Sequence, residues 1–315
     1  MEWMETQPEL PCEKNLAGFL SWQDKAMWIA NGFSKKQGGK DLSLQWSRKE
    51  LLYMNHNAIR DLILGNALEL YGQPKWTFGK NTCNTYEVFP EKLHLENGEI
   101  APAWPVLELI EQDENLTLLF SNWFFASAMR SAVELQKGAT SHLTLSLNLL
   151  PAFANREDCT ERVLGWLQLT GLDAEHLQFE VSEAQTLNAK GIENLNLMHD
   201  SHGVGLLLAN FGTGYSNVDL LRDVHFDGLE LDRSFSMRIP QHEQTCRVVV
   251  GIVHLAHTLD VYVCAKGIET QEQFEFFEEL DCLKGQGFLI GKPMCMEELK
   301  GYIANYAVKH GKARV

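Results

Sequence analysis

The sequence predicts an α/β protein built as a TIM-like (β/α) barrel, with a helical extension at its N-terminus. Short apolar runs of strand length alternate with longer segments whose apolar residues have helical spacing, and six or seven such pairs follow one another. Strands separated by helices pair mainly in parallel, and this number of units fits a closed ring better than an open sheet. The length of 315 residues accommodates one barrel of about 250 residues and an extension.

The extension is expected to comprise residues 1–64, with a mostly helical structure and an unknown role. Its tryptophans indicate packing, either on the barrel domain or against a partner: Trp22, Trp28 and Trp46. A helix is expected over residues 47–66, because apolar residues recur there at helical spacing. Ser47 can cap this helix, and Glu50 can complete a capping box.

The barrel domain is expected over residues 65–310, with each element inferred from its hydrophobic pattern. Strands are expected where Leu, Val and Phe cluster, at residues 68–74, 143–151, 177–183, 204–209, 228–232, 261–269 and 285–293. Helices are expected between them, at residues 104–112, 116–136, 157–170, 191–199, 243–259, 271–280 and 296–307. The chemistry of such a barrel lies where strands end and loops begin, so polar residues at the strand ends are the functional candidates.

Composition disfavours several classes of function. The formal net charge is −15, from 27 basic and 42 acidic residues, which disfavours direct binding to nucleic acid or an anionic membrane but leaves a basic protein partner open. The seven cysteines are scattered without a C-x-x-C pair, as is typical of free thiols in a reducing cytoplasm. No apolar run approaches the length of a membrane span, and the N-terminus lacks a signal-peptide pattern. We therefore expect a cytoplasmic protein.

The stretch from residue 206 to 235 carries the most specific pattern of the chain. An apolar run leads into FGTGYS at residues 211–216, a leucine pair follows, and D-x-L-x-x-D-x-S-F occupies residues 227–235. This pattern resembles the EAL domain, the bacterial phosphodiesterase of cyclic di-GMP, and LELYGQP at residues 68–74 is similar to the strand that opens such a domain. The resemblance implies a barrel of the EAL type, in which carboxylates at the strand ends hold two divalent ions.

The resemblance also assigns site positions, some retained and some substituted. The retained positions are Glu87, Asn148, Glu180, Asp232, Glu269 and Gln286. The substituted positions, where the family has two aspartates, a lysine, a glutamate and a phosphate-binding arginine, are Ala209, Asn210, Glu230, Lys266 and Glu91 respectively. Losing two carboxylates and gaining an ammonium disfavours a two-metal site, since hard divalent ions need anionic oxygens. We therefore expect no catalysis, no bound Mg²⁺ and no other cofactor.

The exchange of charge between Glu230 and Lys266 suggests a swapped ion pair. In this hypothesis, Lys266 occupies the space of the lost metal cations, near Glu87 and Glu180. A cation there would compensate the retained carboxylates, because uncompensated buried charge is costly. The alternative is that the side chains of Glu230 and Lys266 both point to solvent.

Three functions remain open. The first is a catalytically inactive regulatory protein, of the motility or biofilm type, that acts through an unidentified protein partner. The second is a receptor that binds cyclic di-GMP without cleaving it, although Glu91 would repel the phosphate; its candidate contacts are Gln73, Asp232, Gln286 and Pro293. The third is a residual metal-dependent phosphodiesterase. The resemblance also suggests a homodimer through the 211–217 loop, whereas the turn alone would explain the loop's glycines.

Overall fold

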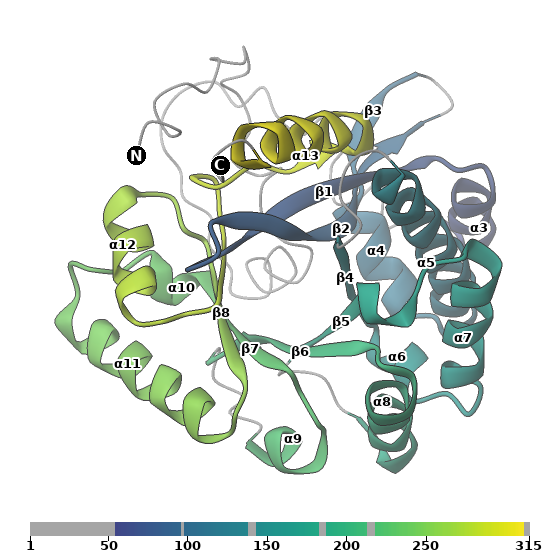
Figure 1. The fold of residues 1–315 in the computed structure, drawn as a ribbon. Coiled ribbons are helices and arrows are strands. Elements are labelled where there is room, and N and C mark those ends of the chain that lie inside the picture. The colour runs from purple at the N-terminus through teal and green to yellow at the C-terminus, as the bar shows by residue number, and fades with distance from the viewer. Residues whose placement is uncertain (1–53, 96–97, 138–142, 183–186, 213–217, 312–315) are drawn as a thin grey trace, which may run out of the picture.

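The strands form a closed ring, with helices packed around its outside (Figure 1). The computed structural model describes residues 54–95, 98–137, 143–182, 187–212 and 218–311. Within these ranges, the ring runs β1-β9-β8-β7-β6-β5-β4-β2 and closes through the pairing of β1 with β2. β1 is antiparallel to both of its neighbours in the ring, and the other ring pairings are parallel. The predicted barrel is therefore confirmed.

The strands follow the predicted order along the chain, with one addition, because β2 was not predicted as a strand. Those of the ring are β1 Leu68–Thr77, β2 Thr82–His94, β4 Thr144–Asn148, β5 Leu177–Ser182, β6 Gly205–Phe211, β7 Gly228–Leu231, β8 Tyr262–Lys266 and β9 Lys284–Gln286. Two short strands pair with members of the ring without being part of it. β3, Ile100–Pro102, pairs with β2, and β10, Met294–Cys295, pairs with β1. These two edge strands were not predicted from the sequence, because they are too short to show a periodic pattern.

The helices lie outside the ring, and those between α3 and α13 fall in the connections between its strands (Figure 1). Their bounds are α3 His56–Leu64, α4 Trp104–Glu111, α5 Glu114–Gln136, α6 Pro151–Ala154, α7 Cys159–Thr170, η2 Ala174–His176, α8 Ala189–His202, α9 Val218–Asp223, α10 Arg233–Ser236, α11 Glu243–Thr258, α12 Gln271–Glu279 and α13 Met296–Gly311. The structure describes no helix that is both long enough and apolar enough to span a bilayer. Its six described cysteines are free thiols.

The prediction of one continuous helix over residues 47–66 is wrong. α3 begins at His56, and residues 54 and 55 are not helical. The reason is local, since the Asn55 side chain accepts a hydrogen bond from the Ala58 amide at 2.9 Å and so caps a new helix there. The predicted cap at Ser47 and the three tryptophans of the extension lie outside the described residues.

An aromatic layer between the ring and its helices fixes the direction in which β5 side chains point. Phe179 of β5 packs edge-on against Phe125 of α5, with ring centroids 5.4 Å apart, and Phe125 also contacts Trp166 of α7. Side chains alternate between the two faces of a strand. With Phe179 directed at the helices, its neighbour Glu180 must point into the barrel.

Gly287 provides a test of the close packing at the end of β9. A Cβ atom at this position would overlap the backbone of Ile268, whose amide donates to Gln286 O at 3.0 Å and whose carbonyl accepts from Leu289 N at 3.1 Å. Because that backbone is held on both sides, we expect Gly287→Ala to lower the free energy of unfolding by about 2–3 kcal/mol. The control is Gly165→Ala in α7, where a Cβ meets nothing within 4 Å. In a urea titration, Gly165→Ala should raise the free energy of unfolding by up to about 1 kcal/mol. Equal effects of Gly287→Ala and Gly165→Ala on this free energy would contradict the account.

Candidate functional site

The interior of the barrel holds a buried network of three carboxylates and two ammonium groups. Lys75 of β1 donates to Glu180 Oε1 at 2.6 Å and to Glu230 Oε2 at 2.8 Å, and all three side chains are fully buried. Lys75 therefore joins β1 to β5 and β7 across the interior of the ring. Charge-assisted hydrogen bonds of this length are among the stronger polar contacts in proteins.

Lys266, the last residue of β8, brings the second ammonium into the network. Its Nζ lies 3.0 Å from Glu230 Oε1, 3.3 Å from Glu87 Oε2 and 3.8 Å from Glu180 Oε2, and its side chain is 8 % exposed. The hypothesis of a Glu230–Lys266 ion pair beside Glu87 and Glu180 is therefore confirmed. The alternative, in which both side chains point to solvent, is wrong.

Neutral side chains donate further hydrogen bonds to two of the carboxylates. Asn148 Nδ2 donates to Glu87 Oε1 and Gln286 Nε2 donates to Glu87 Oε2, each at 3.0 Å. Ser146 Oγ donates to Glu180 Oε1 at 2.6 Å. A buried polar network is stable only when its members find such partners. Three residues retained from the family pattern, Glu87, Asn148 and Gln286, are therefore hydrogen-bonded to one another.

Strand geometry explains why these residues meet. Ser146 and Asn148 are two residues apart on β4, so both point into the barrel. Asn148 pairs with Glu180 in the register of β4 and β5, and Lys266 pairs with Gln286 in that of β8 and β9. The parallel strands all run in one direction, so their carboxyl ends meet at one mouth of the barrel.

The other predicted positions lie outside this ion network. Asp232 is buried directly after β7, where its Oδ1 accepts from the Ser234 amide at 2.9 Å and caps α10. Ala209 and Asn210 are buried at the end of β6, and Glu91 is buried near the end of β2. Glu269 is exposed, and its amide donates to the Gln273 side chain at 2.7 Å.

The candidate nucleotide contacts have roles within the fold. Gln73 on β1 donates to Gly291 O at 2.9 Å, which holds the segment that carries the partly buried Pro293. Gln286 is committed to Glu87, as described above. Most of the loop proposed for a homodimer, residues 213–217, lies outside the described residues, so the homodimer stays a prediction.

Burial and charge set the protonation of the groups inside the barrel. Burial alone would lower the pKa of Lys75, but the Glu180 and Glu230 carboxylates outweigh it and raise that pKa well above its ordinary value. Burial raises the pKa of the Cys264 thiol to about 12, so this thiol stays protonated at neutral pH. Lys75 is thus a permanent cation at neutral pH, and it offsets the charge of the carboxylates that it contacts.

Lys75 was missed by sequence reasoning. The available signal was its position two residues after Gln73, which places both side chains on the same face of β1. Ser146 and Lys284 were missed as well, although each occupies an inward position of a strand. A lone lysine in a strand is ordinarily exposed. Burial of Lys75 can therefore be inferred only once the ring is known to place Glu180 and Glu230 beside it.

Lys284 lies at the amino end of β9, where its positive charge destabilises the folded protein. Its Nζ donates to Thr85 Oγ1 at 3.0 Å and lies 4.9 Å from the ring centroid of Tyr262. Burial, assisted by the Lys75 charge, lowers the pKa of Lys284 to about 8 from the ordinary 10.5. Below pH 8 the folded protein bears the full cost of this partly buried charge. Between pH 8 and 10.5 the folded state binds fewer protons than the unfolded state, so this cost disappears as the pH rises.

We therefore expect Lys284→Met to stabilise the protein by about 2 kcal/mol at pH 7, with an advantage that shrinks toward pH 10. Urea titrations of the wild type and the variant at both pH values measure the difference. The exposed Lys80→Met serves as the control and should show no such pH dependence. A wild-type-to-variant difference that stays constant with pH would contradict the account.

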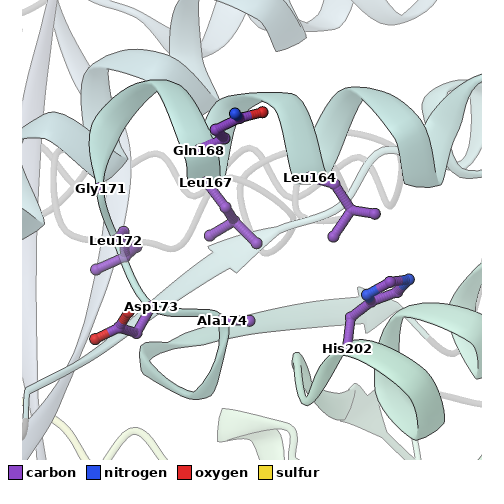
Figure 2. Close-up of a pocket in the computed structure, with 8 residues that line it drawn as sticks. All are labelled: Leu164, Leu167, Gln168, Gly171, Leu172, Asp173, Ala174 and His202. Atoms are coloured by element: carbon purple, nitrogen blue, oxygen red, sulfur yellow. The ribbon is translucent and has the colours of Figure 1, made fainter.

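A separate hollow lies on the outside of the barrel, between α7 and α8 (Figure 2). Its lining comes from α7, from the segment that leads into β5 and from the end of α8: Leu164, Leu167, Gln168, Gly171, Leu172, Asp173, Ala174 and His202. These residues precede β5 and β6, so the hollow lies at the amino end of those strands. It is therefore distinct from the ion network at the opposite end of the ring.

A ring of mainly parallel strands with polar side chains gathered at their carboxyl ends defines the class of the protein, a TIM-like barrel with its candidate site at the mouth. The model of the EAL domain family matches residues 56–293. The chain belongs to the EAL domain family.

Similar proteins include known cyclic di-GMP enzymes. The cyclic di-GMP phosphodiesterase NbdA of Pseudomonas aeruginosa is 28% identical over 249 residues, which cover 79% of this chain and 32% of that protein. The bifunctional diguanylate cyclase/cyclic di-GMP phosphodiesterase MucR of the same organism is 28% identical over 267 residues, which cover 83% of this chain and 38% of MucR. The chain thus spans about a third of the length of these relatives.

Solved structures agree with the fold. The structure of the MucR phosphodiesterase in complex with cyclic di-GMP superposes with a TM-score of 0.71 at 26% identity, over 79% of this chain and 99% of the other. The EAL enzyme Bd1971 in its form with bound cAMP and cyclic di-GMP gives a TM-score of 0.75 at 23% identity, over 82% and 70% of the two chains. At 23% identity, the similarity to Bd1971 supports the fold alone.

Proposed function

We propose that this chain is a non-hydrolysing EAL protein that regulates a bacterial signalling process, of the motility or biofilm type, by binding another protein. The observation that carries the proposal is the position of the Lys266 ammonium, within 3.8 Å of three carboxylates at the mouth of the barrel. A cation supplied by the chain itself occupies the charge-neutralising role that metal ions have in the active family members.

The residues present do not fit a pair of divalent ions. A hard divalent ion bound to Glu87 and Glu180 at about 2.0–2.6 Å would lie within a few ångströms of the Lys266 ammonium, which would repel it. At the end of β6, Ala209 offers no ligand and Asn210 offers at most a neutral one. Glu269, which the family pattern places at the site, is exposed.

The charge of the site also disfavours a bound nucleotide. The three carboxylates outnumber the two ammonium groups, and Asp232 and Glu91 are further acidic residues buried in this part of the barrel. A cyclic dinucleotide carries two phosphate charges, so net negative charge without a metal opposes its binding. Cyclic di-GMP binding without cleavage is therefore an outcome for the test to decide.

The test is to incubate the purified chain with cyclic di-GMP and either Mg²⁺ or Mn²⁺, beside the phosphodiesterase domain of MucR as an active control. We expect the control to produce linear dinucleotide and this chain to produce none, with no heat of binding in a calorimetric titration. Binding without cleavage would make the chain a nucleotide receptor instead. Metal-dependent cleavage would overturn the proposal.

A row of partly exposed apolar residues along α11 supports a role in protein binding. Val248, Leu255 and Leu259 are each about 40% exposed, and their spacing, together with that of the partly buried Ile252, places them in one row. The face of α11 that packs on the barrel, through Val249 and Val253, adjoins this row. Rows of exposed apolar residues are more typical of interaction surfaces than single exposed residues are.

A paired variant tests whether this row contributes to partner binding. Val248→Lys combined with Leu255→Lys should abolish the capture of a specific partner by cross-linking in cells. The matched control is Leu169→Lys, a single exposed leucine on α7 that is 68% exposed. Loss of capture in the control as well, or no loss in either variant, would argue against α11 as the binding surface.

A further inference from the structure

Two histidines and an aspartate converge on the outside of the barrel, at the end opposite the ion network. His199 and Asp200 lie in the last turn of α8, and His225 lies in the segment between α9 and β7. His199 Nδ1 is 2.8 Å from Asp200 Oδ1, and His225 Nδ1 is 2.9 Å from Asp200 Oδ2. One potential ligand atom from each residue lies within 4.8 Å of the other two.

The surrounding structure holds these three side chains in place. Asp227 accepts from the Leu206 amide through Oδ2 at 2.7 Å and contacts His199 Nε2 through Oδ1 at 3.2 Å. A metal ion would replace the proton that His199 Nδ1 donates to Asp200, and Asp227 would then hold the ring through a proton on Nε2. Carboxylates that orient histidines from behind in this way are a regular feature of metal sites.

The backbone around His225 is tied to the same helix. The Asn196 side chain, one turn before His199 on α8, donates to Asp223 O at 2.9 Å and accepts from the His225 amide at 3.0 Å. The two imidazoles are thus positioned from one helix, although they are far apart in the sequence. His225 and Asp200 are exposed, so an ion can reach them from solvent.

We propose that His199, Asp200 and His225 bind a divalent transition-metal ion such as Zn²⁺, with Asp227 as the orienting residue. Two imidazole nitrogens and a carboxylate are donors that suit Zn²⁺ and its neighbours rather than Mg²⁺. Zinc bonds of about 2.0–2.1 Å in a tetrahedral site separate the ligand atoms by about 3.3 Å. The present 2.8–2.9 Å contacts would open slightly, and the ligand atoms that now lie up to 4.8 Å apart would move closer together; solvent could supply the fourth ligand. The ion would clip α8 to the segment that leads into β7.

The test is a calorimetric titration of the chelator-treated full chain with Zn²⁺ at about pH 8, because metal binding displaces protons from its ligands and is favoured at higher pH. The variants are His225→Ala and the matched control His257→Ala on α11, both at exposed positions, so that both should fold. The wild type and all variants share the same partly exposed cysteines, so the differences between them isolate the proposed site.

We expect the wild type and His257→Ala to bind Zn²⁺ with equal affinity and to unfold at a higher temperature in its presence. His225→Ala should bind at least tenfold more weakly and lose the thermal shift. Asp227→Asn should weaken binding by roughly 10- to 100-fold while leaving the ligands intact. The absence of Zn²⁺ binding in the wild type, equal binding in His225→Ala, or an equal loss in His257→Ala would each overturn the proposal. None of these outcomes depends on the function proposed for the mouth of the barrel.

Discussion

Replacing Lys75 by methionine is expected to lower the free energy of unfolding by about 4 kcal/mol at pH 8. The ammonium of Lys75 compensates Glu180 and Glu230, and all three side chains are inaccessible to solvent. Methionine fills a similar volume, so the loss would come from charge rather than from a cavity. Breaking a buried ion pair on one side is costly because the partner charge stays buried without compensation.

The pH dependence and a compensating change separate this charge effect from a packing effect. With Lys75 gone, a stranded glutamate has a folded-state pKa above its unfolded value, so its penalty is present at high pH and relieved on acidification. The loss should therefore be smaller at pH 5 than at pH 8. Adding Glu180→Gln to Lys75→Met should recover part of the stability, and the exposed Lys80→Met should change it by less than about 0.5 kcal/mol. A loss in Lys75→Met that neither depends on pH nor responds to Glu180→Gln would contradict the network.

Lys266→Ala is expected to cost about 3 kcal/mol in a urea titration at pH 8. The effect is smaller than at Lys75 because the Lys266 side chain is 8 % exposed, so water can partly solvate the carboxylates that it leaves. Because Lys266 and Glu230 are in direct contact, their substitutions should not be additive. A double-mutant cycle with Glu230→Gln should give a coupling energy of at least about 1 kcal/mol. A change below about 0.5 kcal/mol in Lys266→Ala would show that its ammonium is not part of the network.

The fold was predictable because its signals are local. Each strand of the ring except β2 coincides with a predicted strand, and the larger helices coincide with periodic segments of the sequence. The pairing of Glu230 with Lys266 was predictable too, because two charges had exchanged places on neighbouring strands. The resemblance placed both residues at the ends of strands in the site. The cost of uncompensated buried charge gave the physical reason for them to pair.

Other parts of the site depend on closure of the ring and could not be read from the sequence. Lys75 meets its partners only because β1 runs antiparallel to its neighbours and closes the ring, so that its inward face confronts β5 and β7. Glu269 fails to join the site because β8 ends at Lys266 and the chain turns at Gly267, whose φ is 82°. The cluster of His199 and His225 likewise arises from tertiary contacts between segments with no shared sequence pattern.

The most direct test of the central claim, that lysine ammonium groups replace metal ions at the mouth of the barrel, is a crystal structure of the chain soaked in Mn²⁺. An anomalous difference map locates bound manganese by position, which separates the mouth from the histidine cluster at the other end. We expect no manganese peak beside Glu87, Glu180 and Asp232, and Lys266 Nζ within hydrogen-bonding distance of Glu230. A manganese ion coordinated by those carboxylates, with Lys266 displaced, would contradict the account.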